Sequence, residues 1–308
     1  MNNRINLNTE ICGIQLENPI MAASGVFGYG YEMLEYFDIN KLGAFSFKGT
    51  TVKERFGNET PRIAECSGGM LNAVGLQNPG LEKVVSEELV KLKKVYNKPL
   101  FANISGFCVE EYINLAEVLS EQDSVNAIEV NISCPNVKHG GMAFGTTANG
   151  AAEVTKAVKK VSKKPIFIKL SPNVTDITEI AKAVENEGAD GISMINTLLG
   201  MRVDIYKRKP VLKNITGGLS GNAIFPIALR MIWQVYNTVK IPIIGMGGVS
   251  TAENAIEMMM CGASAVQIGA AGLVNPYVYM EIIDKLPEIL NNINVHDIKD
   301  IVGAVLDK

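Results

Sequence analysis

Short apolar runs rich in Val, Ile and Ala recur along the chain, and segments with helical spacing lie between most of them. The runs cover residues 18–25, 44–51, 100–106, 127–132, 165–172, 191–197, 241–249 and 265–271. Runs of this length are typical of buried strands, and helices between successive strands indicate parallel pairing. Eight parallel strands are the number that closes a barrel, so the pattern predicts an α/β fold, a (β/α)8 TIM barrel.

The segments between the runs predict helices and two insertions. Helices are expected over residues 31–37, 79–95, 109–119, 147–161, 176–187, 223–238, 252–261 and 276–290. The residues from Ser250 to Glu253 match a capping box that starts one of these helices. Residues 52–78 predict an insertion over the carboxyl-end face of the barrel, and residues 198–220, which carry several Gly and Pro residues, predict a polar loop.

No shift in composition marks a domain boundary, so residues 1–308 are interpreted as a single domain. An open doubly wound sheet is the alternative fold. The Gly-x-Gly-x-x-Gly pattern that such a sheet often carries after its first strand is absent here. The barrel is therefore the favoured interpretation.

The composition narrows the possible partners. A net charge of −3 with 20% charged residues gives no electrostatic case for nucleic acid or an anionic membrane surface. No apolar run approaches the roughly 18 residues of a membrane span, and the amino-terminal residues lack the apolar core of a signal peptide. A cytoplasmic protein is the expectation. The five Cys residues are scattered without a Cys-x-x-Cys pair, so no disulfide framework, zinc site or iron–sulfur site is expected in this chain.

Polar residues gather where the predicted strands end. Because a parallel barrel places all carboxyl ends on one face, these side chains are expected to meet. They are Ser24, Lys48, Asn103, Asn131, Cys134, Lys169, Asn196 and Thr197. Lys48 and Lys169 stand inside apolar strands and therefore require an anionic or polar partner. After the strand at 127–132, Ser133, Cys134 and Asn136 supply amides, a hydroxyl and a thiol that could act as a base; an inert turn is the alternative.

Glycines mark a candidate phosphate site. Gly247 and Gly248 close the seventh predicted strand and Gly269 the eighth, the position where barrels of this kind bind phosphate through backbone amides. A phosphate-bearing cofactor or substrate is predicted, and no Walker pattern argues for ATP. Met70 and the run Met258–Met260 are predicted to fill the hydrophobic core.

Several motifs together resemble one enzyme family over almost the whole chain. They are Asn18-Pro-Ile-Met-Ala-Ala-Ser-Gly25, Lys48-Gly-Thr-Thr51, Arg55-Phe-Gly-Asn-Glu-Thr-Pro-Arg62, Leu71-Asn-Ala-Val-Gly-Leu-Gln-Asn-Pro79, Asn131-Ile-Ser-Cys-Pro-Asn136, Ile195-Asn-Thr197 and Gly245-Met-Gly-Gly248. This set resembles the dihydroorotate dehydrogenases of class 1, in which the active loop carries Cys where class 2 carries Ser. Residues 55–78 resemble subtype B, whose catalytic chain works with an iron–sulfur flavoprotein.

The resemblance implies one FMN at the mouth of the barrel and orotate beside it. The residues implied to contact FMN are Ser24, Lys48, Gly49, Asn103, Asn131, Lys169, Ile195, Gly221, Gly247, Gly248, Gly269 and Ala270. The residues implied to hold the substrate are Lys48, Asn72, Ala73, Val74, Gly75, Leu76, Asn131, Asn136, Asn196 and Thr197. Ala270 departs from the Thr that the family often has there, which removes a hydroxyl donor.

The implied reaction is the oxidation of dihydroorotate to orotate in pyrimidine biosynthesis. Cys134 is the implied base, and Lys169 would stabilise the anionic reduced flavin by its charge. Since a thiol of ordinary pKa is mostly protonated at neutral pH, activity is expected to rise with pH. FAD and a [2Fe–2S] cluster are expected on a partner subunit only, which passes electrons to NAD in an assembly of two catalytic and two electron-transfer chains.

Three other functions remain as alternatives. A subtype A enzyme would be a homodimer that passes electrons to fumarate, and residues 55–78 argue against it. A non-redox barrel, such as an isomerase or aldolase, would bind phosphate without flavin and would be colourless. A binding module without catalysis would leave the thiol and the lysines at the strand ends unexplained.

Overall fold

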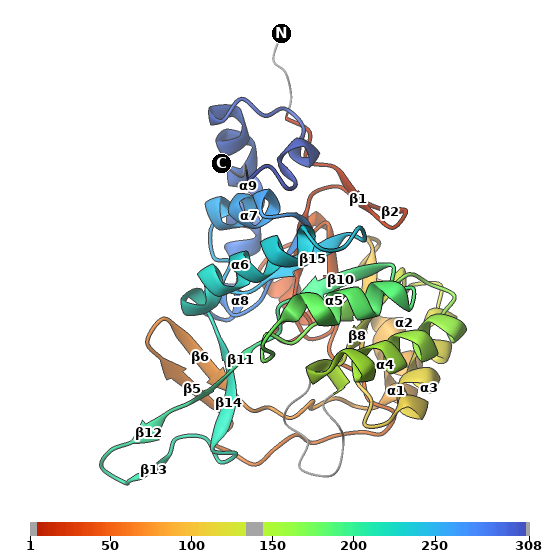
Figure 1. Ribbon diagram of the computed structural model, residues 1–308, viewed down its shortest axis with the longest axis vertical. Helices are drawn as coiled ribbons and strands as arrows, with labels where there is room; N and C mark the ends of the chain where they lie inside the picture. The colour runs from red at the N-terminus through yellow and green to blue at the C-terminus, as the bar shows by residue number, and fades with distance from the viewer. Residues whose placement is uncertain (1–4, 134–143, 306–308) are drawn as a thin grey trace.

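The computed structural model describes residues 5–133 and 144–305, and its centre is a closed barrel of eight parallel strands (Figure 1). In chain order the strands are β3 (Ile20–Ala22), β4 (Ala44–Ser46), β7 (Leu100–Ile104), β8 (Ala127–Asn131), β9 (Ile166–Lys169), β10 (Gly191–Met194), β15 (Ile243–Met246) and β16 (Ala263–Ile268). Each strand pairs with the next, and β16 pairs with β3 to close the ring. The predicted (β/α)8 barrel is confirmed.

Helices connect the strands on the outside of the barrel. They are α1 (Leu81–Lys83), a π-helical turn (Val84–Glu88), α2 (Leu89–Leu92), α3 (Val109–Ser120), α4 (Ala148–Val161), α5 (Ile177–Asn186), α6 (Phe225–Tyr236), α7 (Ala252–Met260), α8 (Ala271–Val274) and α9 (Val278–Asn292). Short 3-10 helices cover Tyr31–Glu35, Ile39–Lys41, Phe144–Thr146, Asn222–Ile224 and Ile298–Ile301. The predicted helix at 31–37 is thus a 3-10 helix.

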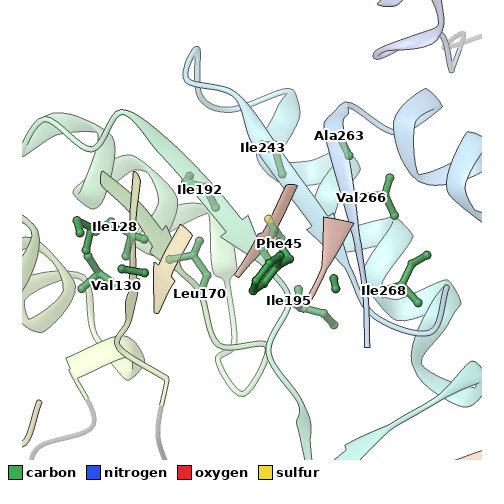
Figure 2. Close-up of a cluster of buried hydrophobic side chains, with 14 of the residues drawn as sticks. Phe45, Ile128, Val130, Leu170, Ile192, Ile195, Ile243, Ala263, Val266 and Ile268 are labelled. Atoms are coloured by element: carbon green, nitrogen blue, oxygen red, sulfur yellow. The ribbon is translucent and has the colours of Figure 1, made fainter. Parts of the chain in front are cut away.

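Alternation along the strands divides the core into two parts. Successive strand residues face opposite sides of a sheet. Ile128 and Val130 of β8 belong to the large cluster that packs against the helices, and Figure 2 shows them with apolar side chains of other barrel strands. Ala127 belongs instead to a second cluster, which includes Phe101 and Phe167. The second cluster therefore fills the inside of the barrel.

A hairpin closes the amino-terminal end of the barrel. Strands β1 (Thr9–Ile11) and β2 (Ile14–Leu16) pair antiparallel, and Ile11 and Leu16 pack in the same cluster as Phe101 and Phe167. In Figure 1 the two strands lie in the upper half of the view, on the right.

The prediction of a polar loop over residues 198–220 is wrong. This segment contains β11 (Leu198–Met201), β12 (Val203–Asp204), β13 (Lys209–Pro210) and β14 (Thr216–Ser220). Strands β11 and β14 join β5 (Ile63–Cys66) and β6 (Gly69–Asn72) of the predicted insertion in one four-stranded antiparallel sheet, called the second sheet below. Figure 1 shows this sheet projecting beyond the barrel, with the β12–β13 hairpin at its far end.

The start of α7 differs by one residue from the predicted capping box. Thr251 is the N-cap, because its hydroxyl accepts a hydrogen bond from the amide of Asn254 at 3.2 Å. The Asn254 side chain in turn accepts from the amide of Ser250 at 3.3 Å. Within residues 5–133 and 144–305, none of the helices has the length and apolar character that crossing a membrane requires.

Candidate active site

A cavity of about 490 Å³ opens at the carboxyl ends of the barrel strands. The barrel contributes Lys48 after β4, Asn103 of β7 and Lys169 of β9, while Asn72 of β6 lines it from the second sheet. Its volume falls in the range of roughly 300–1,000 Å³ that is usual for small-molecule sites. The insertion predicted to cover this face therefore forms one wall of the cavity.

Lys48 and Lys169 have different surroundings, although both line the cavity. The Lys169 ammonium lies 3.5 Å from the carboxylate of Glu129 on the neighbouring strand β8. The Lys48 ammonium forms no ion pair or hydrogen bond with any residue in the described ranges. Burial lowers the pKa of Lys48, and the charge of Arg62 lowers it further. Lys48 is thus a partly buried cation that an anionic ligand would stabilise.

The loop from Val74 to Leu76 presents backbone donors to the cavity. Its carbonyls accept hydrogen bonds from within the insertion: Asn58 donates to Val74, Arg55 to Gly75 and Asn78 to Leu76. The amides of these three loop residues donate to no described residue. Successive free amides form an anion-binding concavity.

A second group of free amides lies after the last two barrel strands. The amides of Gly247, Gly248, Gly269 and Ala270 donate no hydrogen bond to residues in the described part of the chain. A Cβ on Gly248 would lie 2.8 Å from the backbone nitrogen of Phe225, and its φ of +78° also favours glycine. The backbones of Gly248 and Phe225 thus lie close together. With the free amides they form the cradle that the glycine pattern predicted for a phosphate.

Amide side chains connect the middle of the cavity. Asn131 Oδ1 accepts a hydrogen bond from Asn196 Nδ2 at 3.3 Å and another from the amide of Ser133 at 3.2 Å. Asn196 also accepts from the amide of Thr197. These contacts fix the planes of two amides that line the cavity. Fixed amides can orient a planar polar ligand.

The structure brings most of the predicted site residues together around this cavity. All residues implied to contact FMN line it: Ser24, Lys48, Gly49, Asn103, Asn131, Lys169, Ile195, Gly221, Gly247, Gly248, Gly269 and Ala270. Of the residues implied to hold the substrate, Asn72, Val74, Gly75, Leu76, Asn196 and Thr197 also line it. What these residues bind stays a prediction.

Three predicted site residues are exceptions. Cys134 and Asn136 lie outside the described residues. Ala73 is fully buried and does not line the cavity. Its amide donates to the carbonyl of Arg62 and its carbonyl accepts from Asn58, so its backbone groups are occupied within the insertion.

Sequence reasoning missed several lining residues because they belong to elements that it did not predict. Ile63, Met70 and Ser220 come from the four-stranded sheet, and Leu273 comes from the short helix α8. The placement of Met70 in the hydrophobic core was therefore wrong, whereas Met258 and Met259 are fully buried there.

Glu129 was also missed, although the sequence carries a signal. It is a charged residue in the middle of the apolar run from Ala127 to Ile132. Such a residue requires a partner by the same physical argument that singled out Lys48 and Lys169. Its side chain is fully buried and contacts Lys169, which lines the cavity.

Comparisons with known proteins agree with this geometry. Residues 6–290 match the family model described as dihydroorotate dehydrogenase. Similar relatives include a protein of Halalkalibacterium halodurans, 55% identical over 97% of both chains, and one of Malacoplasma penetrans, 53% identical over 98% of both. A third, from Enterococcus faecalis, is 52% identical over 97% of this chain and 96% of its own. Each relative bears the name dihydroorotate dehydrogenase B (NAD(+)), catalytic subunit.

Proposed function

Because this chain belongs to the dihydroorotate dehydrogenase family, we propose that it oxidises dihydroorotate to orotate as the catalytic subunit of an NAD-linked enzyme. The observation that carries the proposal is a set of donors in the cavity that have no partner among the described residues. They are the Lys48 ammonium and the amides of Val74, Gly75 and Leu76. Substrate and product each carry one carboxylate on a small polar ring, and charge-assisted hydrogen bonds to a carboxylate are the strong ones.

The described residues also fit FMN. The free amides from Gly247 to Gly248 and from Gly269 to Ala270 would hold its phosphate, and Lys169 and Asn103 would face its polar ring edge. Bound FMN would supply the acceptor for the hydride from C6 of dihydroorotate. Because Ala270 has no hydroxyl group, it can donate to the phosphate only through its backbone amide.

The substrate must lose a proton from C5 as the hydride leaves C6, so a base is required. Cys134 is proposed as that base on the sequence motif, since it follows directly after Ser133, a residue that lines the cavity. Replacing it by serine, Cys134→Ser, should slow reduction of the bound cofactor by dihydroorotate at neutral pH by about 10²-fold or more. Full activity of this variant in a rapid-mixing experiment would reject Cys134 as the base.

The electrons must then reach NAD through a second protein. The relatives are named catalytic subunits, and this supports a separate electron-transfer subunit. We propose that this subunit carries FAD and a [2Fe–2S] cluster and that two copies of each chain assemble. The overall reaction is then balanced: dihydroorotate and NAD⁺ give orotate, NADH and one proton.

The test is the visible absorption spectrum of the purified chain, before and after anaerobic addition of dihydroorotate. Flavin bands that bleach are expected, while NAD⁺ added to this chain alone should remain unreduced. A flavin that stays oxidised would reject the substrate. A chain that takes up no FMN on reconstitution would reject the flavin and favour the non-redox barrel, and NADH formation by the chain alone would reject the partner.

A further inference from the structure

Glu129 lies inside the barrel, directly below the cavity. It is two residues before Asn131 on β8, so both side chains face the interior. The second cluster, which fills the inside of the barrel, places Ala127 one level lower, among the apolar side chains of the amino-terminal half. Glu129 is 0% exposed. A carboxylate at this position is expensive unless it is fully paired.

Four polar groups from four other barrel strands surround the Glu129 carboxylate. Ser46 of β4 and Asn103 of β7 donate to Oε2, the former at 3.0 Å, and Gln267 of β16 donates to Oε1 at 3.0 Å. The fourth group is the Lys169 ammonium, 3.5 Å from Oε2. Burial alone would raise the pKa of Glu129, but the Lys169 charge and the three hydrogen bonds hold the pKa below its ordinary value. The carboxylate is therefore the ionised form at neutral pH.

The cluster connects a buried charge to the proposed cofactor site. Lys169 and Asn103 contact Glu129 below and line the cavity above. Lysine is a flexible chain that loses rotamer entropy when it is fixed. The ion pair is what restrains the Lys169 side chain at the cavity floor, since no other ion pair or side-chain hydrogen bond of its ammonium occurs in the described ranges.

We propose that Glu129 is a positioning residue that acts through Lys169: its carboxylate fixes the ammonium at the floor of the cavity as a counter-charge for reduced flavin. This inference rests on the proposed function, since it assigns FMN to the cavity. Without this carboxylate, no group among the described residues holds the Lys169 ammonium at the cavity floor. An ammonium that leaves this position no longer stabilises the anionic reduced cofactor.

The test compares the midpoint potential of bound FMN in the parent chain and in Glu129→Gln. Gln keeps the size and can accept from Ser46 but lacks the charge. The reduced cofactor should bind at least tenfold more weakly relative to the oxidised one, which lowers a two-electron potential by about 30 mV. Ser46→Ala is the matched control, because it removes one hydrogen bond and leaves the charge pair intact; its shift should be several times smaller.

A double-mutant cycle separates action through Lys169 from general damage. In a Lys169→Met background, Glu129→Gln should leave the potential unchanged. Equal shifts in the two backgrounds, or an unchanged potential in Glu129→Gln itself, would overturn the inference. If Glu129→Gln does not fold, Glu129→Asp keeps the charge on a shorter side chain. Glu129→Asp should lower the potential of bound FMN, and an unchanged potential in this variant would also overturn the inference.

The experiment does not depend on the substrate. The potentials are measured by reduction with dithionite against a reference dye, without dihydroorotate. A parent chain that binds no FMN contradicts the proposed function. If the parent chain binds FMN but the potentials of the variants differ from those expected, only the role of Glu129 is contradicted.

Discussion

Lys48 and Lys169 look alike in the sequence but differ in the folded chain. Each stands in an apolar run of the sequence, and the cost of burying an ammonium predicts a partner for both. Only Lys169 has one among the described residues, and this partner, Glu129, comes from a neighbouring strand. The pairing depends on barrel register, Asn131 standing opposite Lys169, which a single sequence does not specify. The need for an anion was predictable, whereas its identity was not.

Replacing Lys48 by methionine should weaken orotate binding. Methionine keeps a similar length and packs against the same apolar walls, but it removes the cation. A hydrogen bond to a charged group contributes about 1.5–3 kcal/mol, so the dissociation constant should rise roughly 10- to 150-fold. Calorimetric titration of the FMN-loaded chain with orotate measures this change. An unchanged constant would mean that Lys48 does not face the carboxylate.

The same residue predicts a pH dependence. Burial lowers the pKa of Lys48, and Arg62 adds to the effect. The ammonium is therefore present below this lowered pKa and is lost as pH rises through it, whereas the orotate carboxylate stays ionised throughout. Orotate affinity should fall at alkaline pH before an ordinary lysine would titrate, near 10.4. In Lys48→Met the fall over that range should be absent, and an identical fall in both proteins would assign it to another group.

At the scale of elements, the barrel followed from the sequence and the second sheet did not. Each barrel strand is an apolar run buried on both faces, so its pattern is local. Strand β14 carries Gly217 and Gly218, which resemble a loop, and it pairs with β6, whose residues lie far earlier in the chain. The glycines are there because a Cβ at Gly217 would lie 2.7 Å from the carbonyl oxygen of Asn72. Close contact between distant segments is not visible in local composition.

Gly218→Ala should therefore damage the cavity wall. Its Cβ would lie 2.0 Å from Thr197 Oγ1 and 2.6 Å from Thr197 Cβ, so Thr197 must move. Thr197 lines the cavity, and overpacking of this kind costs about 1–3 kcal/mol. A small displacement of positioning groups can lower catalysis up to about 10²-fold. Steady-state kinetics with dihydroorotate should show kcat/KM at least tenfold lower.

Gly200→Ala on the adjacent strand β11 is the control. Its Cβ would meet only the end of the Leu71 side chain at 3.0 Å and Leu219 Cβ at 3.6 Å. A flexible methyl group can move by the few tenths of an ångström that are needed. Kinetics close to those of the parent chain are expected, and an equal loss in both variants would mean that the whole sheet, not Thr197, responds.

At the scale of the molecule, stability and chemistry occupy opposite ends of the barrel. The carboxyl end carries the cavity and the second sheet, and the amino end is closed by the β1–β2 hairpin. Between them lies the interior level of Ser46, Glu129 and Gln267. This order follows from alternation along parallel strands. The position of the cavity was predictable, because polar residues gather at the strand ends that form it. The position of the hairpin was not, because its strands are too short to produce a pattern.

Leu16→Ala tests this division. Leu16 is 1% exposed and packs with Phe101 and Phe167 inside the barrel. Its truncation leaves a void and should lower the free energy of unfolding by about 2–5 kcal/mol, measured by urea denaturation. The adjacent Gln15 is exposed, so Gln15→Ala should change it by about 0.5 kcal/mol or less. Both variants should keep the KM of the parent chain for dihydroorotate. The interior level of Ser46, Glu129 and Gln267 separates the hairpin from the cavity. A raised KM in Leu16→Ala alone would show that the amino end is coupled to the site.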